Sequence, residues 1–392
     1  MKKSTVVHQY AEVIGPSVSE GSSLIAMKVR QRVPELDILR FIAASAVVVY
    51  HLTYRVPSGN ALSGSFFQPL PMVSRFGYLG VNLFFMISGF VILWSALDRT
   101  PTEFVLSRFT RLFPSFWVSV ALTSLALLAT NAQDGVTLVR FVGNLTMVPG
   151  ALRIPYIDGV YWTLFVELKF YLLIWFLIVS RLIHRSSVWL PVWLIILVAS
   201  AFQVTPHWLM SLSLFPYGAY FAAGCYFYLM RASGSNASRL LGIVVAAALC
   251  LEHSLRQQQE FMNEVNRASG VVVMGCVASF FALLGVISLR PLLSGGTNTA
   301  VIMGAMTYPL YLLHNRIGKI IFQFVGPADH GEWFSLALAF GFVYALSYAV
   351  SLVTERRVCG ALHRRLSAMV LPARTPNALY RTGQSSDPAA PP

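Results

Sequence analysis

The sequence predicts an all-α fold, a polytopic integral-membrane bundle of about ten transmembrane helices. Of the 392 residues, 56% are hydrophobic and only 11% are charged, and the mean hydropathy is +0.64. Soluble domains carry about 25% charged residues. Because a chain this long with so little charge cannot cover a water-facing surface, most of it is expected to face lipid.

Ten apolar stretches approach the length of a membrane span, which requires about 20 residues. We expect these spans at about 36–56, 78–97, 113–131, 160–180, 188–204, 208–230, 239–252, 270–289, 300–323 and 333–354. The stretch at 239–252 is the shortest of the ten.

The distribution of basic residues predicts the orientation, because lysine and arginine gather in cytoplasmic loops. With the N-terminus inside, 19 Lys and Arg residues fall in inside segments, 8 in outside segments and 2 within spans. Both termini are therefore expected to be cytoplasmic, which requires an even number of spans. The net charge of +13 fits the same rule. Since the basic residues are spread over many short loops, we expect membrane lipids, and no nucleic acid, as partners.

The chain divides into three expected parts. Residues 1–33 are polar and lack a continuous apolar core, so they are expected to form a cytoplasmic segment without a cleavable signal. Residues 34–356 hold all ten spans. Residues 357–392 are expected to be cytoplasmic, basic at first and then a disordered tail. We expect no separate soluble domain, and the four cysteines show no metal-ligand spacing, so no metal site is expected.

The first span contains two ionisable residues, Arg40 and His51, which lie eleven residues apart. At about 100° per residue this spacing places both on one helix face, separated by a rise of about 16 Å. Arg40 is near the cytoplasmic end and His51 is in the outer third. Ionisable residues inside a membrane usually face a cavity and mark a site. The alternative is that Arg40 reaches the headgroups and His51 packs against a helix.

Arg108 and Arg111 are three residues apart, so they share a helix face at the cytoplasmic boundary. They are either a positive-inside anchor or a cytoplasmic phosphate clamp, because arginine forks match phosphate oxygens. Arg40 lies at the same membrane side and could join them.

Two further ionisable residues lie deep in later spans. Glu167 in the fourth span is about 10 Å below the outer boundary, and His314 in the ninth is about 20 Å above the cytoplasmic boundary. His51, Glu167 and His314 thus converge in depth, while their lateral distance stays open. Structural pairing and ordinary packing are the alternatives. Possible supporting residues are Asn82, Ser88, Trp162, Tyr308 and Tyr311.

Five segments resemble, in order, those of the membrane acyltransferase-3 family. LDILRFIAASAVVVYH resembles its first-helix motif, an Arg followed eleven residues later by His. LGVNLFFMISGF resembles its second-helix segment, and RFTRLFP its Arg-x-x-Arg-x-x-Pro motif. YWTLFVELKFY and MTYPLYLLHN resemble its Trp-x-Leu-x-x-Glu and Tyr-x-x-His segments. The five segments lie between Leu36 and Asn315, and the resemblance as a whole extends over residues 35–355.

The resemblance implies about ten helices in a bacterial cytoplasmic (inner) membrane and transfer of an acyl group, often acetyl, from an acyl-CoA to a hydroxyl. The expected acceptor is a saccharide, such as an exopolysaccharide, an O-antigen or a lipid-linked sugar, although another hydroxyl compound is possible. Acyl-CoA is expected as a co-substrate, with no permanently bound cofactor. The oligomeric state stays open.

The residue chemistry agrees with that implication. A neutral histidine can take the proton of an attacking hydroxyl, so we expect His51 to be the general base, with Glu167 orienting its imidazole and His314 a further catalytic residue. An acyl-histidine relay is an alternative. We expect Arg40, Arg108 and Arg111 to bind the donor's phosphates. A transporter or flippase, and a sensor or scaffold protein, are the rival interpretations.

Overall fold

The computed structural model of the chain describes residues 33–55, 69–130, 135–262, 267–290, 292, 298–326 and 331–370. Within these ranges every regular element is a helix. The α-helices are α1 (Pro34–Val49), α2 (Pro69–Ser74), α3 (Gly80–Ala96), α4 (Pro101–Ala129), α5 (Leu138–Leu145), α6 (Trp162–Val179), α7 (Ser186–Ala201), α8 (His207–Leu212), α9 (Gly218–Ser233), α10 (Ala237–Phe261), α11 (Arg267–Leu289), α12 (Asn298–Val325), α14 (Glu332–Val353) and α15 (Gly360–Val370).

The predicted all-α membrane bundle is confirmed. In the described ranges, seven helical segments are long and apolar enough to cross a membrane, and they contain α1, α3, α4, α6, α10, α11 and α14. The other three expected spans correspond to α7 and α9, of 16 residues each, and to α12, which carries several polar residues. A count of ten spans therefore stays a prediction.

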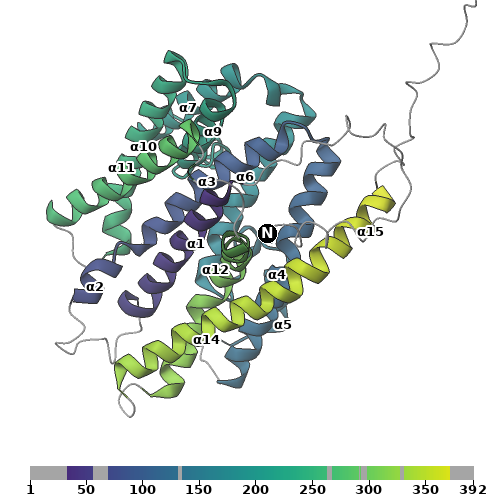
Figure 1. Cartoon of the computed structure of the whole chain (residues 1–392), viewed down its shortest axis with the longest axis vertical. Coiled ribbons are helices and arrows are strands. Elements are labelled where there is room, and N and C mark those ends of the chain that lie inside the picture. The colour runs from purple at the N-terminus through teal and green to yellow at the C-terminus, as the bar shows by residue number, and fades with distance from the viewer. Residues whose placement is uncertain are drawn as a thin grey trace, which may run out of the picture. The chain divides into compact units, whose positions relative to one another are not determined.

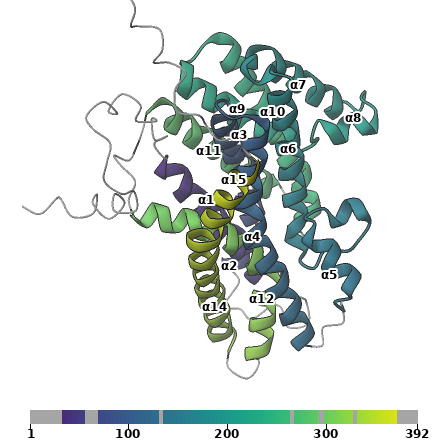
Figure 2. The same ribbon diagram turned by 90° about the vertical axis from the view of Figure 1, so that its right-hand side faces the viewer.

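Close packing of helices that are far apart in the sequence brings the residues of the candidate site together. α12 packs against α1, α14 and α4, and Figures 1 and 2 show these helices as neighbours. α3 packs along α9. A Cβ at Gly89 of α3 or Gly224 of α9 would collide with the facing backbone. Small residues of this kind let membrane helices approach closely.

α4 begins well before the expected start at 113. Pro101 stands in its first turn, and Thr100 and Glu103 form reciprocal side-chain to backbone hydrogen bonds. This capping box satisfies amide groups that a helix start otherwise leaves unpaired. The helix therefore starts in the polar loop, and Arg108 and Arg111 lie inside it.

Two other boundaries differ from the sequence prediction. The stretch 208–230 is interrupted near Pro216, which has no N–H to donate inside a helix, and α8 and α9 form on either side. α10 continues to Phe261, beyond the expected end at 252, because polar residues of its second half are buried. Ser254 faces Asn82 of α3, and His253 faces Tyr220 of α9.

The first helix ends in an unusual turn. α1 passes at Val49 into a π-helical turn, η2 (Tyr50–Tyr54), and His51 lies in this turn. Single π turns are rare and occur often at functional sites. The predictions for residues 1–32 and for the tail at 371–392 lie outside the described residues.

Candidate active site

His51 of η2 and His314 of α12 are direct neighbours. Nε2 of His314 lies 3.1 Å from Nδ1 of His51, and the ring centroids are 5.0 Å apart. His314 is fully buried and His51 is half-buried. The two histidines that share a depth in the sequence analysis are therefore also side by side.

The other contacts of the pair decide which nitrogens carry hydrogen. Nδ1 of His314 lies 2.8 Å from the carbonyl oxygen of Tyr311 and 3.2 Å from that of Leu310. Because carbonyl oxygens only accept, this nitrogen is the donor, and Nε2 of the neutral ring accepts. Nδ1 of His51 faces that Nε2 and the carbonyl oxygen of Val47, at 3.0 Å. Both are acceptors, so Nδ1 of His51 carries the hydrogen.

It follows that Nε2 of a neutral His51 keeps its lone pair. Among the described residues, this nitrogen has no hydrogen-bond partner. An unpaired imidazole nitrogen of this kind can accept a proton from a bound hydroxyl.

A buried carboxylate, Asp158, lies near the pair. Its Oδ1 accepts from Nδ2 of Asn315 at 2.6 Å and from the N–H of Val160 at 3.2 Å, and its Oδ2 accepts from the N–H of Arg316 at 2.9 Å. These bonds tie the loop before α6 to α12. They also hold the carboxylate beside the turn of α12 that follows His314.

A cavity of about 260 Å³ adjoins His51. We call it the histidine cavity, and its wall includes Tyr50, His51, Arg55, Trp162, Gln257 and Lys319. Trp162 packs against Tyr217, with ring centroids 5.2 Å apart. Asn82 lies behind the wall and donates from Nδ2 to Oε1 of Gln257 at 2.9 Å. Trp162 is thus in the wall, and Asn82 positions a wall residue.

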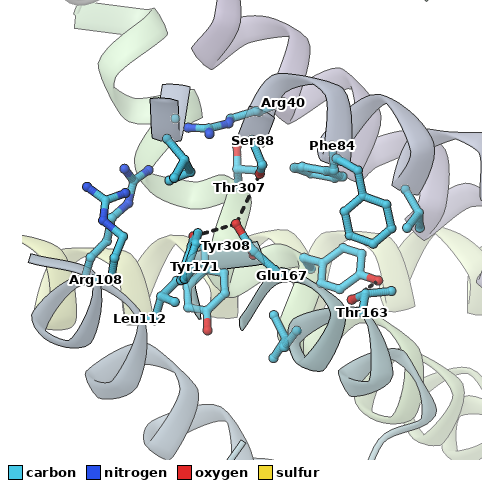
Figure 3. A pocket seen from close by; sticks show the side chains of 17 residues that line it. Arg40, Phe84, Ser88, Arg108, Leu112, Thr163, Glu167, Tyr171, Thr307 and Tyr308 are labelled. Carbon is cyan, nitrogen blue, oxygen red and sulfur yellow. Dashed lines mark hydrogen bonds between the residues drawn. The ribbon is translucent and has the colours of Figure 1, made fainter. Parts of the chain in front are cut away.

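A second, smaller cavity of about 80 Å³ holds the expected arginine cluster. We call it the arginine cavity, and its wall includes Arg40, Ser88, Arg108, Arg111, Glu167 and Tyr308. Figure 3 shows Arg40 and Arg108 at one side of it and Glu167 between them and Thr163. Three arginines and one carboxylate give this wall a net positive charge.

Two buried groups in the arginine cavity lack a partner among the described residues. They are Nε of Arg108 and the hydroxyl of Tyr308, for which this part of the chain provides no hydrogen bond. Such groups are rare in native proteins and are often explained by an absent water, ion or ligand. Guanidinium groups fit phosphate oxygens in particular, so this wall suits an anionic, phosphorylated molecule.

Glu167 lies in the arginine cavity and does not contact His51, which corrects the expectation that it orients the imidazole. Its Oε1 accepts from the hydroxyl of Tyr171 at 2.6 Å and from Oγ of Ser88 at 3.1 Å (Figure 3). Depth along the membrane gave no information on the direction in which α6 turns this side chain. In the structure, His314 contacts His51, and Asp158 is the carboxylate near the pair.

The two cavities share part of their walls. Val81, Thr163 and Tyr311 line both, and Oγ1 of Thr163 donates to the hydroxyl of Tyr311 at 2.9 Å. A single layer of side chains therefore separates the arginine cavity from the histidine cavity.

Sequence reasoning missed several residues of the site. Asp158 stands directly before an apolar helix, and its side chain accepts from the N–H of Val160 as an N-cap residue does. This position is a signal that could have found it. Arg55 and Lys319 count as outside loop residues in the positive-inside rule, which hides their place beside His51.

Comparison with known proteins shows the family to which the chain belongs. A family model described as an acyltransferase domain matches residues 33–356, which is most of the chain and includes every residue that lines the two cavities. The chain belongs to this acyltransferase family.

Three curated relatives resemble parts of this acyltransferase-family chain. Nodulation protein 10 of Rhizobium leguminosarum bv. viciae is 32% identical over 156 residues, 35% of this chain and 41% of the relative. Acyltransferase MdmB of Streptomyces mycarofaciens is 29% identical, over 40% of this chain and 43% of the relative. Peptidoglycan O-acetyltransferase OatA of Listeria monocytogenes is 26% identical, over 37% of this chain and 24% of the relative. The chain thus matches less than half the length of each, and no solved structure matches it.

Proposed function

We propose that this chain is an integral-membrane O-acyltransferase. It moves an acyl group, with acetyl as the first case to test, from an acyl-CoA to a hydroxyl of a saccharide. The observation that carries the proposal is Nε2 of His51, which has no partner among the described residues. His51 lines a cavity one layer of side chains away from a cluster of arginines.

The arginine cavity is the proposed donor site. Coenzyme A carries several phosphates, and Arg40, Arg108 and Arg111 supply guanidinium groups for them. The thioester arm then extends along α1 past Thr163 and Tyr311 toward His51. The rise of about 16 Å between Arg40 and His51 sets the length of this path.

The transfer step is a direct attack. The acceptor oxygen attacks the thioester carbonyl carbon, and its proton passes to Nε2 of His51. The new C–O bond forms as the C–S bond breaks, and the departing sulfur takes the proton from the imidazolium, which gives an ester and free coenzyme A. While His51 is charged, its Nδ1–H donates to Nε2 of His314, and the nearby Asp158 carboxylate stabilises the positive charge.

The histidine cavity is the proposed acceptor site. OatA is named as a peptidoglycan O-acetyltransferase, which supports a saccharide hydroxyl as the acceptor here. The proposed location is a bacterial cytoplasmic membrane with both termini inside, which the distribution of Lys and Arg supports. In this orientation the arginine cavity receives the donor from the cytoplasm.

Free thiol release tests this function. Purified protein in lipid vesicles receives acetyl-CoA with or without a saccharide extract, and thiol and ester are both measured. We expect thiol release that depends on protein and extract together and that matches the ester formed. A transporter or flippase would move saccharide without consuming the thioester, and that result would contradict the proposal.

A further inference from the structure

The wall of the histidine cavity carries positive charge that the transfer step does not use. Arg55 and Lys319 both line this cavity, and no Asp or Glu is among its lining residues in the described part of the chain. Arg55 directly follows the π-helical turn that holds His51. Lys319 lies five residues after His314 on α12. Both cations therefore stand close to the proposed base.

Lys319 has no ion pair in the described ranges. Asp158 is the acid within electrostatic range of it, but the oxygens of Asp158 already accept from Asn315, Arg316 and Val160. A half-buried ammonium at membrane depth normally has a partner, because an uncompensated charge there is costly. Among the described residues, the wall therefore offers no negatively charged side chain to Lys319.

The remaining wall suits a sugar ring better than a lipid chain. Tyr78 and Phe261 stack with ring centroids 5.3 Å apart, and the buried hydroxyl of Tyr78 has no partner in the described part of the chain. Gln257 and Asn315 add amide groups. Aromatic faces with a few placed polar groups are typical of sites for small polar ligands. The volume of about 260 Å³ admits one such unit rather than a long polymer segment.

We propose that the histidine cavity selects an acceptor saccharide that bears an anionic group, a carboxylate or a phosphate, close to the hydroxyl that is acylated. This inference rests on the proposed function and names the class of its acceptor. Lys319 and Arg55 bind the anion, and so hold the neighbouring hydroxyl beside Nε2 of His51.

The test uses the saccharides of the cells that contain the protein. Glycans and lipid-linked saccharides are separated by anion exchange into a neutral and an acidic pool, and each pool is offered to purified protein with radiolabelled acetyl-CoA. We expect the acidic pool to be labelled with a kcat/KM at least about tenfold higher, as a charged hydrogen bond provides. Labelling mainly in the neutral pool would overturn the inference.

Chemical treatment of the acidic pool identifies the anion. Reduction of carboxyl groups removes uronate charge, whereas phosphatase and mild acid remove phosphate. One of these treatments should lower acceptor activity to the level of the neutral pool. An acidic pool that keeps full activity after both treatments would also overturn the inference.

Variants connect the preference to the cavity wall. Lys319→Gln and the exposed Arg55→Gln should each lower the ratio of kcat/KM for the acidic pool to kcat/KM for the neutral pool about tenfold or more, with an unchanged donor KM. Lys319→Arg should keep the preference. Lys169→Gln and Arg153→Gln are the matched controls, since neither residue lines a cavity described here.

Different results would contradict the preference for an anionic acceptor and the acyltransferase function on which it rests. If Lys319→Gln and Arg55→Gln lower labelling of both pools equally, the charge preference is wrong and the acyltransferase function stands. If the native protein consumes no acetyl-CoA with either pool, the proposed function itself is contradicted.

Discussion

The two ring nitrogens of His51 have different roles because their surroundings differ. Nδ1 faces two acceptors, the Val47 carbonyl oxygen and Nε2 of His314, and it is therefore held as a donor. Nε2 lacks a partner in the described residues and is left to accept a proton. Which nitrogen is free follows from hydrogen-bond partners on two helices, so the sequence alone could not predict it.

His314 is a positioning residue, and its replacements should differ according to whether they keep an acceptor at Nε2. His314→Gln places a side-chain oxygen near that position, whereas His314→Leu cannot accept a hydrogen bond. A hydrogen bond to a charged group is worth about 1.5–3 kcal/mol, so we expect His314→Leu to lower kcat about ten- to a hundredfold and His314→Gln to lower it less.

Kinetics as a function of pH separate this role from a purely structural one. Loss of the acceptor destabilises the His51 imidazolium, so the acidic limb of the kcat profile should move to lower pH in His314→Leu with little change in either KM. Equal losses in the two variants, with unchanged pH profiles, would show that His314 only fills space.

At the scale of helices, the hydrophobic pattern predicts well which residues form each helix. It predicts poorly the direction in which a side chain points from that helix. The spans at 36–56 and 333–354 agree closely with the helical segments Pro34–Tyr54 and Glu332–Val353. Arg40 and His51, which the spacing predicts on one helix face, line the arginine cavity and the histidine cavity respectively. The buried polar half of α10 depends on tertiary contacts, and the apolar pattern contains neither these contacts nor the π-helical turn. The capping box of α4 is local, and its Thr-x-x-Glu pattern is a sequence signal for the helix start.

The direction of Glu167 is the clearest example at this scale. Counting residues along α6 gives its depth, but its carboxylate is turned toward Ser88 of α3 by the packing of the two helices. Depth agreement left the lateral distances open, and in the structure His314 contacts His51, whereas Glu167 bonds to Ser88 and Tyr171.

α4 carries two arginines of the donor site, and their loss should act on the donor alone. Arg108→Gln and Arg111→Gln each remove a group proposed to bind phosphate, so we expect donor KM to rise about tenfold or more while acceptor KM stays unchanged. Initial rates over a range of acetyl-CoA concentrations measure this.

Two comparisons separate the loss of a phosphate-binding group from unfolding and from a general loss of surface charge. Arg108 is buried and its variant could unfold, whereas Arg111 is exposed, so Arg111→Gln tests the role without that risk. Arg185→Gln is the control, because Arg185 is exposed and lines neither cavity. A donor KM that is the same in all three variants would argue against the phosphate site.

At the scale of the molecule, the account requires two substrates to approach from opposite ends of α1. The arginine cavity adjoins Arg40 and the histidine cavity adjoins His51, and both meet at Val81, Thr163 and Tyr311. The positive-inside distribution predicts which end is cytoplasmic. The shared wall could not be predicted, since it joins α3, α6 and α12, which are far apart in the sequence.

Cysteine labelling tests this orientation. Arg153→Cys and Arg185→Cys introduce exposed thiols in loops expected on opposite membrane sides, in a protein whose Cys276 and Cys359 are replaced by Ser. In intact spheroplasts, a membrane-impermeant maleimide should label Arg153→Cys at once and Arg185→Cys only after permeabilisation. The reverse pattern would place the arginine cavity outside and contradict donor entry from the cytoplasm.

The central claim is that Nε2 of His51 is the base, and the His51→Asn variant tests it most directly. Asn keeps an N–H near the place of Nδ1, where it can still donate to the Val47 carbonyl oxygen and His314, but it offers no basic nitrogen. With purified protein at saturating acetyl-CoA and acceptor, we predict a kcat lower by about 10²–10⁴ and an unchanged unfolding temperature. A folded His51→Asn protein that transfers acetyl at nearly the native rate would contradict the account.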